Sequence, residues 1–216
     1  PMLAQAVERL TGFIPPERVL VITNASLVDV SREAAPELPP ENIIGEPFGR
    51  DTAAACALGA AIVKARCENG SFCILTADHV IKDVELFQRT LHEGFEAAEA
   101  GGTLVTIGIR PQFPSTGFGY IECGDKVAGE GDIPFFRAKR FVEKPDADTA
   151  KSYLDAGNFF WNSGMFIWSA DSLLRAVAEF EPPLLGMAEA IQPVVDSDTF
   201  DDRLAEEYGK LEKIST

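Results

Sequence analysis

The stretch Phe72-Cys73-Ile74-Leu75-Thr76-Ala77-Asp78-His79 joins a short apolar run to a polar turn. Four consecutive apolar residues bounded by polar ones are typical of a strand buried on both faces of a sheet. Asp78 then falls at the carboxyl end of this strand, which is where doubly wound sheets bind their ligands. The stretch therefore predicts both a strand of a parallel sheet and a candidate ligand group.

Short strands alternate with helical patterns through the first half of the chain. Apolar runs predict further strands at 19–22, 42–44 and 103–108, and helical spacing predicts helices at 1–11, 26–35, 52–66 and 84–100. This alternation predicts an α/β fold with a Rossmann-like, mostly parallel sheet flanked by helices.

The pattern changes after residue 110. We expect strands at 118–122 and 137–143 joined by a polar, Gly-rich segment at 124–132, then an aromatic run at 159–168 and helical residues at 171–208. No linker long enough to separate independent domains occurs. We therefore expect one domain over residues 1–216, with halves at 1–110 and 111–216.

The composition excludes several classes of protein. The 216 residues carry 19 Lys and Arg against 34 Asp and Glu, a net charge of −15, which argues against a nucleic-acid partner. No run of about 18 apolar residues occurs, so we expect no membrane partner. Four cysteines without a C-x-x-C pair, and two histidines, argue against a structural zinc site and indicate reduced, buried thiols in a cytoplasmic protein.

The segment Glu46-Pro47-Phe48-Gly49-Arg50-Asp51-Thr52-Ala53 lies between an expected strand and an expected helix, and it has two interpretations. Asp51 or Thr52 can cap the following helix. Alternatively, the Glu46 carboxylate can accept hydrogen bonds from the N1–H and 2-amino edge of guanine, which adenine lacks. Arg50 can then meet a phosphate or fix the loop.

Asp78 also has two interpretations. As an oxygen ligand at a strand end, it can hold Mg²⁺ together with substrate phosphates. Alternatively, it can be a turn residue or cap the next helix. His79 beside it can be a general base or a metal ligand, but a lone histidine is more often structural.

Further polar or flexible residues lie in the second half of the sequence. Gly119 either permits close backbone approach to a ligand or marks a bulge. Glu143 and Lys144 are adjacent, and adjacent side chains on a strand point to opposite faces of the sheet. They can therefore serve one ligand only if the strand twists or ends there, as the following proline suggests. Glu143 would then bind sugar hydroxyls and Lys144 a phosphate. The alternative is a pair of surface ions. Asn162 is polar in an aromatic run and needs hydrogen-bonding partners that a sugar can supply.

In their order and spacing, these motifs resemble the sugar-phosphate nucleotidyltransferases, and within them the mannose-1-phosphate guanylyltransferases (GDP-mannose pyrophosphorylases). The resemblance extends from the first predicted helix to Lys213-Ile214-Ser215. It rests on Glu46-Pro47, Arg50-Asp51-Thr52-Ala53, Ala77-Asp78-His79, Gly117-Phe118-Gly119-Tyr120, Phe141-Val142-Glu143-Lys144-Pro145 and Trp161-Asn162-Ser163-Gly164-Met165-Phe166. It implies a glycosyltransferase-A-like domain in which residues 1–110 bind nucleotide and residues 111–216 bind sugar phosphate.

The resemblance also implies a reaction and roles for individual residues. GTP and mannose 1-phosphate would be the substrates, Mg²⁺ the cofactor, and GDP-mannose and pyrophosphate the products of an in-line attack. Asp78 would be the metal ligand and, with Lys144, a catalytic residue. The implied nucleotide-binding residues are Glu46, Arg50, Asp51, Thr52, Ala77 and Asp78. The implied sugar-phosphate-binding residues are Gly119, Glu143, Lys144 and Asn162.

The sequence departs from the family pattern in three places. Thr76 stands where the family usually has proline, which should be tolerated. A Gly-rich, Arg-containing loop that precedes the first helix in the family is not in this sequence, and neither is a second metal-binding Asp just after Ile214-Ser215. We therefore expect a domain truncated at both ends, weakly active or inactive alone, with poor stability and an unpaired sheet edge.

Two other functions remain open from the sequence. One is a uridylyl- or thymidylyltransferase acting on glucose 1-phosphate, against which the Glu46-Pro47 loop and the run 161–164 favour the guanylyl branch. The other is a catalytically silent regulatory homologue that binds a nucleotide sugar, against which the retained Asp78, Glu143 and Lys144 argue. The oligomeric state also remains open, with a homo-oligomer among the alternatives.

Overall fold

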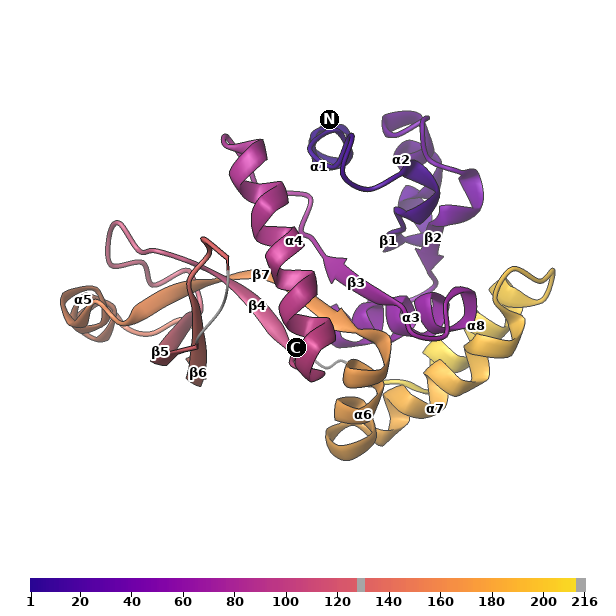
Figure 1. Cartoon of the computed structure of the whole chain (residues 1–216). Helices are drawn as coiled ribbons and strands as arrows, with labels where there is room; N and C mark the ends of the chain where they lie inside the picture. Colours follow the sequence, from indigo (N-terminus) through magenta and orange to yellow (C-terminus); the bar gives the residue numbers. More distant parts are fainter. Residues whose placement is uncertain (128–130, 213–216) are drawn as a thin grey trace. The chain divides into compact units, whose positions relative to one another are not determined.

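The computed structural model describes residues 1–127 and 131–212, and the chain forms two compact units (Figure 1). The first unit comprises Pro1–Leu104 and Ile167–Thr216, and the second comprises Val105–Phe166. Residues 128–130 of the expected Gly-rich segment and Ile214-Ser215 lie outside the described residues. The assignment of nucleotide binding to 1–110 and of sugar-phosphate binding to 111–216 remains a prediction.

The first unit contains short strands and most of the helices. Its strands are β1 (Val21–Asn24), β2 (Ile43–Glu46) and β3 (Ser71–Ile74). Its α-helices are α1 (Met2–Glu8), α2 (Val28–Ala34), α3 (Asp51–Arg66), α4 (Val84–Gly101), α6 (Ala170–Phe180), α7 (Pro182–Ile191) and α8 (Phe200–Lys210). Single 3₁₀ turns occupy Pro16–Arg18, Ala25–Leu27, Pro40–Asn42 and Gln192–Val194.

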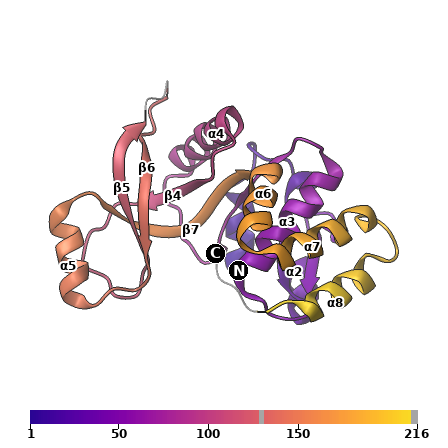
Figure 2. The same ribbon diagram turned by 90° about the horizontal axis from the view of Figure 1, so that it is seen from below.

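Helix α3 is the centre of the first unit. Its Ala-rich sequence is buried over most of its length, and Ala57, Leu58 and Ala60 are fully buried. Small side chains let neighbouring helices approach closely, and α6 and α7 pack against α3 while α8 packs against α7 (Figure 2). The first turn of α3 is therefore fixed by a rigid core, and it carries the candidate residues Asp51 and Thr52.

Strands β1 and β2 pair in parallel, with Asn24 opposite Glu46 at their carboxyl ends. This ladder confirms that Glu46 stands at the end of a strand. We predicted that β1 and β3 are buried on both faces, and this prediction is wrong, because their residues are at most half-buried. Among the described strands, β1 pairs only with β2, and β3 is at the end of its sheet's order.

The second unit is built on antiparallel pairing. It contains β4 (Val105–Ile109), β5 (Tyr120–Val127), β6 (Phe135–Val142), α5 (Ala147–Ala156) and most of β7 (Phe159–Ser169), whose last residues belong to the first unit. The sheet that contains these strands has the order β3-β7-β5-β6, in which β3 comes from the first unit. Strand β4 also pairs with β7. Strand β5 runs antiparallel to both β6 and β7.

This pairing confirms the α/β class but corrects the prediction of a mostly parallel sheet, since β1 and β2 are parallel whereas β5 is antiparallel to both β6 and β7. The physical reason is the length of the connection. The chain between Val127 and Phe135 is too short for the crossover of a dozen or more residues that parallel neighbours require, so β5 and β6 form a hairpin.

An aromatic core fixes the second unit. Tyr120 is fully buried, and Tyr153 from α5 stacks on Phe159 with ring centroids 3.9 Å apart. The Tyr120 hydroxyl donates to the carbonyl oxygen of Ser115 at 2.9 Å and accepts from its N–H at 2.9 Å. This core holds the start of β5 in place, directly after Gly119.

All four cysteines are free thiols, as predicted, but they are not all buried. Cys56 is buried, Cys73 and Cys123 are half-buried, and Cys67 is exposed. Burial raises the pKa of both Cys56 and Cys73 to about 12, which keeps these thiols protonated and unreactive. In the described part of the chain, no helix is long and apolar enough to span a membrane.

Candidate functional site

The loop after β2 is tied to the C-terminal helix of the first unit. The Tyr208 hydroxyl donates to Glu46 Oε1 at 3.1 Å, and Arg50 Nε donates to the carbonyl oxygen of Tyr208 at 3.1 Å. The Arg50 guanidinium also lies over the Phe48 ring, 5.6 Å from its centroid. Of the two predicted roles of Arg50, the structure therefore shows the fixing of the loop.

The Glu46 carboxylate lies in a partly buried environment. Burial raises the pKa of Glu46, and the hydrogen bond from Tyr208 opposes this by lowering it. The pKa of Tyr208 is raised by its own burial and by the neighbouring Glu46 carboxylate, so its hydroxyl keeps its proton and acts as a donor. The result is a half-buried carboxylate with one oxygen committed to Tyr208.

The first turn of α3 does not have the predicted cap. Arg50 occupies the N-cap position and no side chain there accepts a capping hydrogen bond. Asp51 has φ of 61°, in the left-handed region, at a cost on the order of 1 kcal/mol for a residue with a side chain. Asp51 and Thr52 are both exposed. The capping interpretation of these two residues is therefore wrong.

Asp78 lies exposed in the turn after β3, next to the exposed Ala77 and between the half-buried Thr76 and His79. It does not cap the next helix, because the side chain of Asp83 accepts the capping hydrogen bond from the Leu86 N–H at 2.9 Å. Its carboxylate is exposed in the turn that follows β3, which fits both the turn-residue interpretation and the metal-ligand interpretation.

Arg9, the C-cap residue of α1, holds the turn that carries Asp78. Its guanidinium donates to the carbonyl oxygens of Thr76 at 2.7 Å and His79 at 3.0 Å. Arg9 is 5% exposed and lies over the Phe87 ring, 5.3 Å from its centroid. Burial lowers the pKa of Arg9, and the neighbouring Cys73 and Asp78 raise it. Arg9 could not be identified from the sequence, because a single arginine in a predicted amphipathic helix gives no signal of a partner 67 residues away.

The donor set around Asp78 fits only an open metal site. Within the described residues, no group of three or more His, Cys, Asp or Glu side chains could enclose a metal ion. Mg²⁺ is commonly held by one or two carboxylates together with substrate phosphates. A single exposed carboxylate therefore fits a Mg²⁺ ion that takes most of its other ligands from a bound nucleotide.

The second unit brings three of the predicted sugar-phosphate residues together. The Asn162 N–H donates to the Gly119 carbonyl oxygen at 2.8 Å. A Cβ atom at Gly119 would lie 2.8 Å from Glu143 Oε2 and 3.6 Å from Asn162 Cβ. The Asn162 Oδ1 accepts from the Gly164 N–H at 3.1 Å, which orients the side-chain amide. Gly119 thus permits a close approach of the Glu143 carboxylate, while its approach to a ligand remains a prediction.

Glu143 and Lys144 follow the end of β6. The strand ends at Val142, as the sequence predicts, and Lys144 then adopts φ of 41°. This turn places Lys144 Nζ 3.3 Å from Glu143 Oε1, and both side chains are exposed. The acid and the base therefore share one side of the chain instead of pointing to opposite faces. The surface-ion interpretation and the ligand interpretation both fit this geometry.

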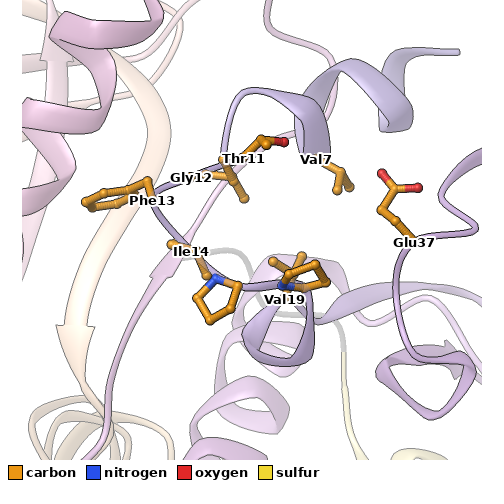
Figure 3. A pocket seen from close by; sticks show the side chains of 10 residues that line it. Val7, Thr11, Gly12, Phe13, Ile14, Val19 and Glu37 are labelled. Atoms are coloured by element: carbon orange, nitrogen blue, oxygen red, sulfur yellow. The ribbon is translucent and has the colours of Figure 1, made fainter.

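A cavity of about 260 Å³ lies elsewhere in the first unit, around the turn after α1 (Figure 3). Its lining is mostly apolar, with Thr11 and Glu37 as polar members, and none of the predicted site residues is in it. Figure 3 shows Val7, Val19 and Glu37 on its walls. The cavity has none of the convergent polar groups expected of a nucleotide site.

The chain matches a known protein family and is similar in sequence to several known proteins. The model of a family described as nucleotidyl transferase matches residues 1–198. A mannose-1-phosphate guanylyltransferase of Escherichia coli strain K12 is 39% identical over 210 residues, which cover 95% of this chain and 44% of that protein. The ManC mannose-1-phosphate guanylyltransferase of Salmonella typhimurium strain LT2 is 39% identical over 211 residues, covering 95% and 43%. The chain thus spans less than half the length of these curated relatives.

Two solved structures share the fold. A crystal structure described as a mannose-1-phosphate geranyltransferase from Thermus thermophilus superposes with a TM-score of 0.83 and 31% identity, over 99% of this chain and 58% of that chain. A crystal structure described as a mannose-6-phosphate isomerase from Helicobacter pylori superposes with a TM-score of 0.78 over 99% of this chain and 82% of that chain. At 24% identity, the second shows likeness of fold alone.

Proposed function

Because this chain belongs to the nucleotidyl transferase family, we propose that the protein transfers a guanylyl group from GTP to mannose 1-phosphate. The observation that carries the proposal is the 39% identity, over 95% of the chain, to proteins named mannose-1-phosphate guanylyltransferase. The products are GDP-mannose and pyrophosphate. The sugar-phosphate oxygen forms a bond to the α-phosphorus while the bond from that phosphorus to the bridging oxygen breaks and pyrophosphate leaves.

In the nucleotide subsite, Glu46 accepts hydrogen bonds from the N1–H and the 2-amino group of guanine. The contact from Tyr208 supports this role, because it holds the carboxylate in one orientation. Arg50 keeps the loop on α8, and Asp51, Thr52 and Ala77 line the nucleotide. Adenine offers no such donor pair, so the subsite favours GTP over ATP.

Asp78 would hold Mg²⁺ in this subsite. When bound, the ion supplies charge neutralisation for the phosphates at the reacting phosphorus. The exposure of Asp78 and the rigid support of its turn by Arg9 favour this role. The turn is held before substrate arrives, so little of the binding energy is lost in ordering it.

In the sugar-phosphate subsite, Glu143 accepts hydrogen bonds from sugar hydroxyls and the Asn162 amide binds the same sugar. Gly119 leaves free the space that a side chain would fill. This role is supported by the position of Glu143, because a Cβ atom added at Gly119 would lie 2.8 Å from Glu143 Oε2. Lys144 neutralises the phosphate of mannose 1-phosphate. Its exposed ammonium, 3.3 Å from Glu143, is available to a dianionic ligand.

The proposal is tested by the release of pyrophosphate from the full-length protein, with GTP, ATP, UTP or dTTP each paired with mannose 1-phosphate or glucose 1-phosphate. We expect turnover that requires Mg²⁺ and is fastest with GTP and mannose 1-phosphate. In the same assay, Asp78→Ala should lose roughly 100-fold in Mg²⁺-dependent turnover, on the order expected for a lost metal ligand.

Three results would contradict it. Faster turnover with UTP or dTTP and glucose 1-phosphate would make the protein a different nucleotidyltransferase. Binding of GDP-mannose without any pyrophosphate formation would support a regulatory homologue. Unchanged turnover in Asp78→Ala would remove Asp78 as the metal ligand.

A further inference from the structure

We propose that Tyr208, on α8, is a positioning residue that sets the base preference of the nucleotide subsite by holding the Glu46 carboxylate ionised and oriented. The inference rests on the proposed role of Glu46 in reading guanine. It adds a residue that makes no contact with substrate itself and that lies 162 positions along the chain from the group it controls.

The geometry makes Tyr208 a two-sided clamp on the loop between β2 and α3. Its hydroxyl donates to Glu46 Oε1, and its backbone carbonyl accepts from Arg50 Nε, both at 3.1 Å. The Tyr208 side chain is fully buried, so no water competes for the hydroxyl. One residue therefore fixes both ends of the segment between β2 and α3.

The chemistry of the hydrogen bond selects a protonation state. A phenol that donates to a carboxylate oxygen favours the ionised form, because the charge strengthens the bond. Only the ionised carboxylate can accept from both the N1–H and the 2-amino group of guanine, since a protonated oxygen is a donor. With Oε1 oriented by Tyr208, the lone pairs that face the nucleotide are fixed in direction.

The surroundings of Glu46 oppose its ionised form. Burial raises the pKa of Glu46 and so favours the protonated form that cannot read guanine. Among the described residues, the ionisable groups that interact with Glu46 include Tyr208 from α8 and Cys56 from α3, while Arg50 in the same loop donates to the Tyr208 carbonyl oxygen. The Cys56 thiol is protonated, with its pKa raised to about 12. Tyr208 is therefore the neighbour that donates to the carboxylate.

The test is Tyr208→Phe in the full-length protein, which removes the hydroxyl and keeps the ring and the backbone carbonyl. Dissociation constants for GTP and ATP are measured by titration calorimetry between pH 5 and pH 8. We expect the GTP-over-ATP preference to fall about tenfold, as for the loss of one hydrogen bond to a charged group. GTP binding should weaken at low pH, where Glu46 becomes protonated; we call this part of the pH profile the acid limb. In Tyr208→Phe we expect the acid limb to move to higher pH, because the pKa of Glu46 rises without its donor.

Two further variants separate positioning from simple stability. Tyr120→Phe removes an equally buried hydroxyl, bonded to Ser115, and should lower stability without changing the base preference. In a Glu46→Gln background, adding Tyr208→Phe should change the preference no further, because Tyr208 acts through the carboxylate. Should Tyr208→Phe fold poorly, fluorotyrosine at position 208 gives the opposite arm: a stronger donor should move the acid limb to lower pH.

The outcomes separate this inference from the proposed function. A wild-type protein that binds GTP no better than ATP overturns both. A wild-type protein that prefers GTP, with a Tyr208→Phe variant that keeps the full preference and the same acid limb, overturns the role of Tyr208 alone. An equal loss of preference in the Glu46→Gln background also overturns it, because the effect would then not pass through Glu46.

Discussion

The candidate residues of the first unit and those of the second are held in place by different kinds of contact. In the first unit, Arg50 and Glu46 reach Tyr208 across 158 and 162 residues of sequence, and Arg9 reaches Thr76 across 67. Buried side chains at helices α1 and α8 thus position loops at the ends of strands. The geometry of the proposed nucleotide subsite therefore depends on the packing of elements far apart in the chain.

In the second unit, strand pairing and the local aromatic core bring the residues together. Gly119 precedes β5, Glu143 follows β6, and Asn162 lies on β7, which pairs with β5 in a register that sets Tyr120 opposite Trp161. The side chains of Glu143 and Lys144 are exposed, and they have no buried clamp among the contacts described above. The difference predicts that remote substitutions damage the nucleotide subsite, whereas only local ones damage the sugar-phosphate subsite.

The largest effect is expected from Arg9→Met. The substitution leaves the carbonyl oxygens of Thr76 and His79 without a charged donor and should lower the free energy of unfolding by about 3 kcal/mol, the order of two hydrogen bonds from a charged group. Urea denaturation measures it. Arg32→Met on α2, which removes an exposed ion pair with Asp29, should change stability by less than about 1 kcal/mol. Equal effects of the two variants would remove the distinction between buried clamps and surface pairs.

A smaller and purely local effect is expected from Gly119→Ala. The new Cβ displaces the end of the Glu143 side chain, which is flexible and exposed, so stability should change little while the KM for mannose 1-phosphate rises about tenfold. The KM for GTP should stay the same. Steady-state kinetics with each substrate varied in turn measures both values.

Gly117→Ala is the matched control for this change. Within 4 Å and among the described residues, a Cβ at Gly117 would meet only the Ser115 Oγ, at an ordinary contact distance of 3.8 Å. Its kinetics should equal those of the wild type. A rise in the KM for GTP in Gly119→Ala, or the same defect in Gly117→Ala, would contradict the local assembly of the sugar-phosphate subsite.

The contrast between the units also explains how far sequence analysis could go. Local patterns predicted most helices and strands to within a few residues and the end of β6 before Pro145. Each of these depends on neighbours in sequence or on a short motif. The exposed carboxylate of Asp78 at a strand end follows from the apolar run before it in the same way.

Features that depend on distant partners could not be predicted. The sequence gives no sign that Arg9 and Tyr208 hold loops, because their partners are set by packing. Strand direction is equally non-local, so the mostly parallel sheet was a wrong prediction for β5, β6 and β7. The positive φ of Asp51 and Lys144 was also missed, since neither residue type by itself requires a left-handed conformation.

The smallest expected effect is the pH dependence of stability contributed by Glu46, which tests whether the nucleotide subsite is strained by its buried charge. Burial raises the folded-state pKa of Glu46 above its ordinary value of 4.5, so its favourable contribution is complete below that pH and is lost as pH rises through the raised value. Glu46→Gln removes this titration. The stability of the wild type relative to Glu46→Gln, measured by urea denaturation at each pH, should therefore fall as pH rises from 4.5 toward neutrality. A relative stability that instead increases over this interval would mean that the bond from Tyr208 outweighs burial, and that the ionised carboxylate is the form the fold prefers.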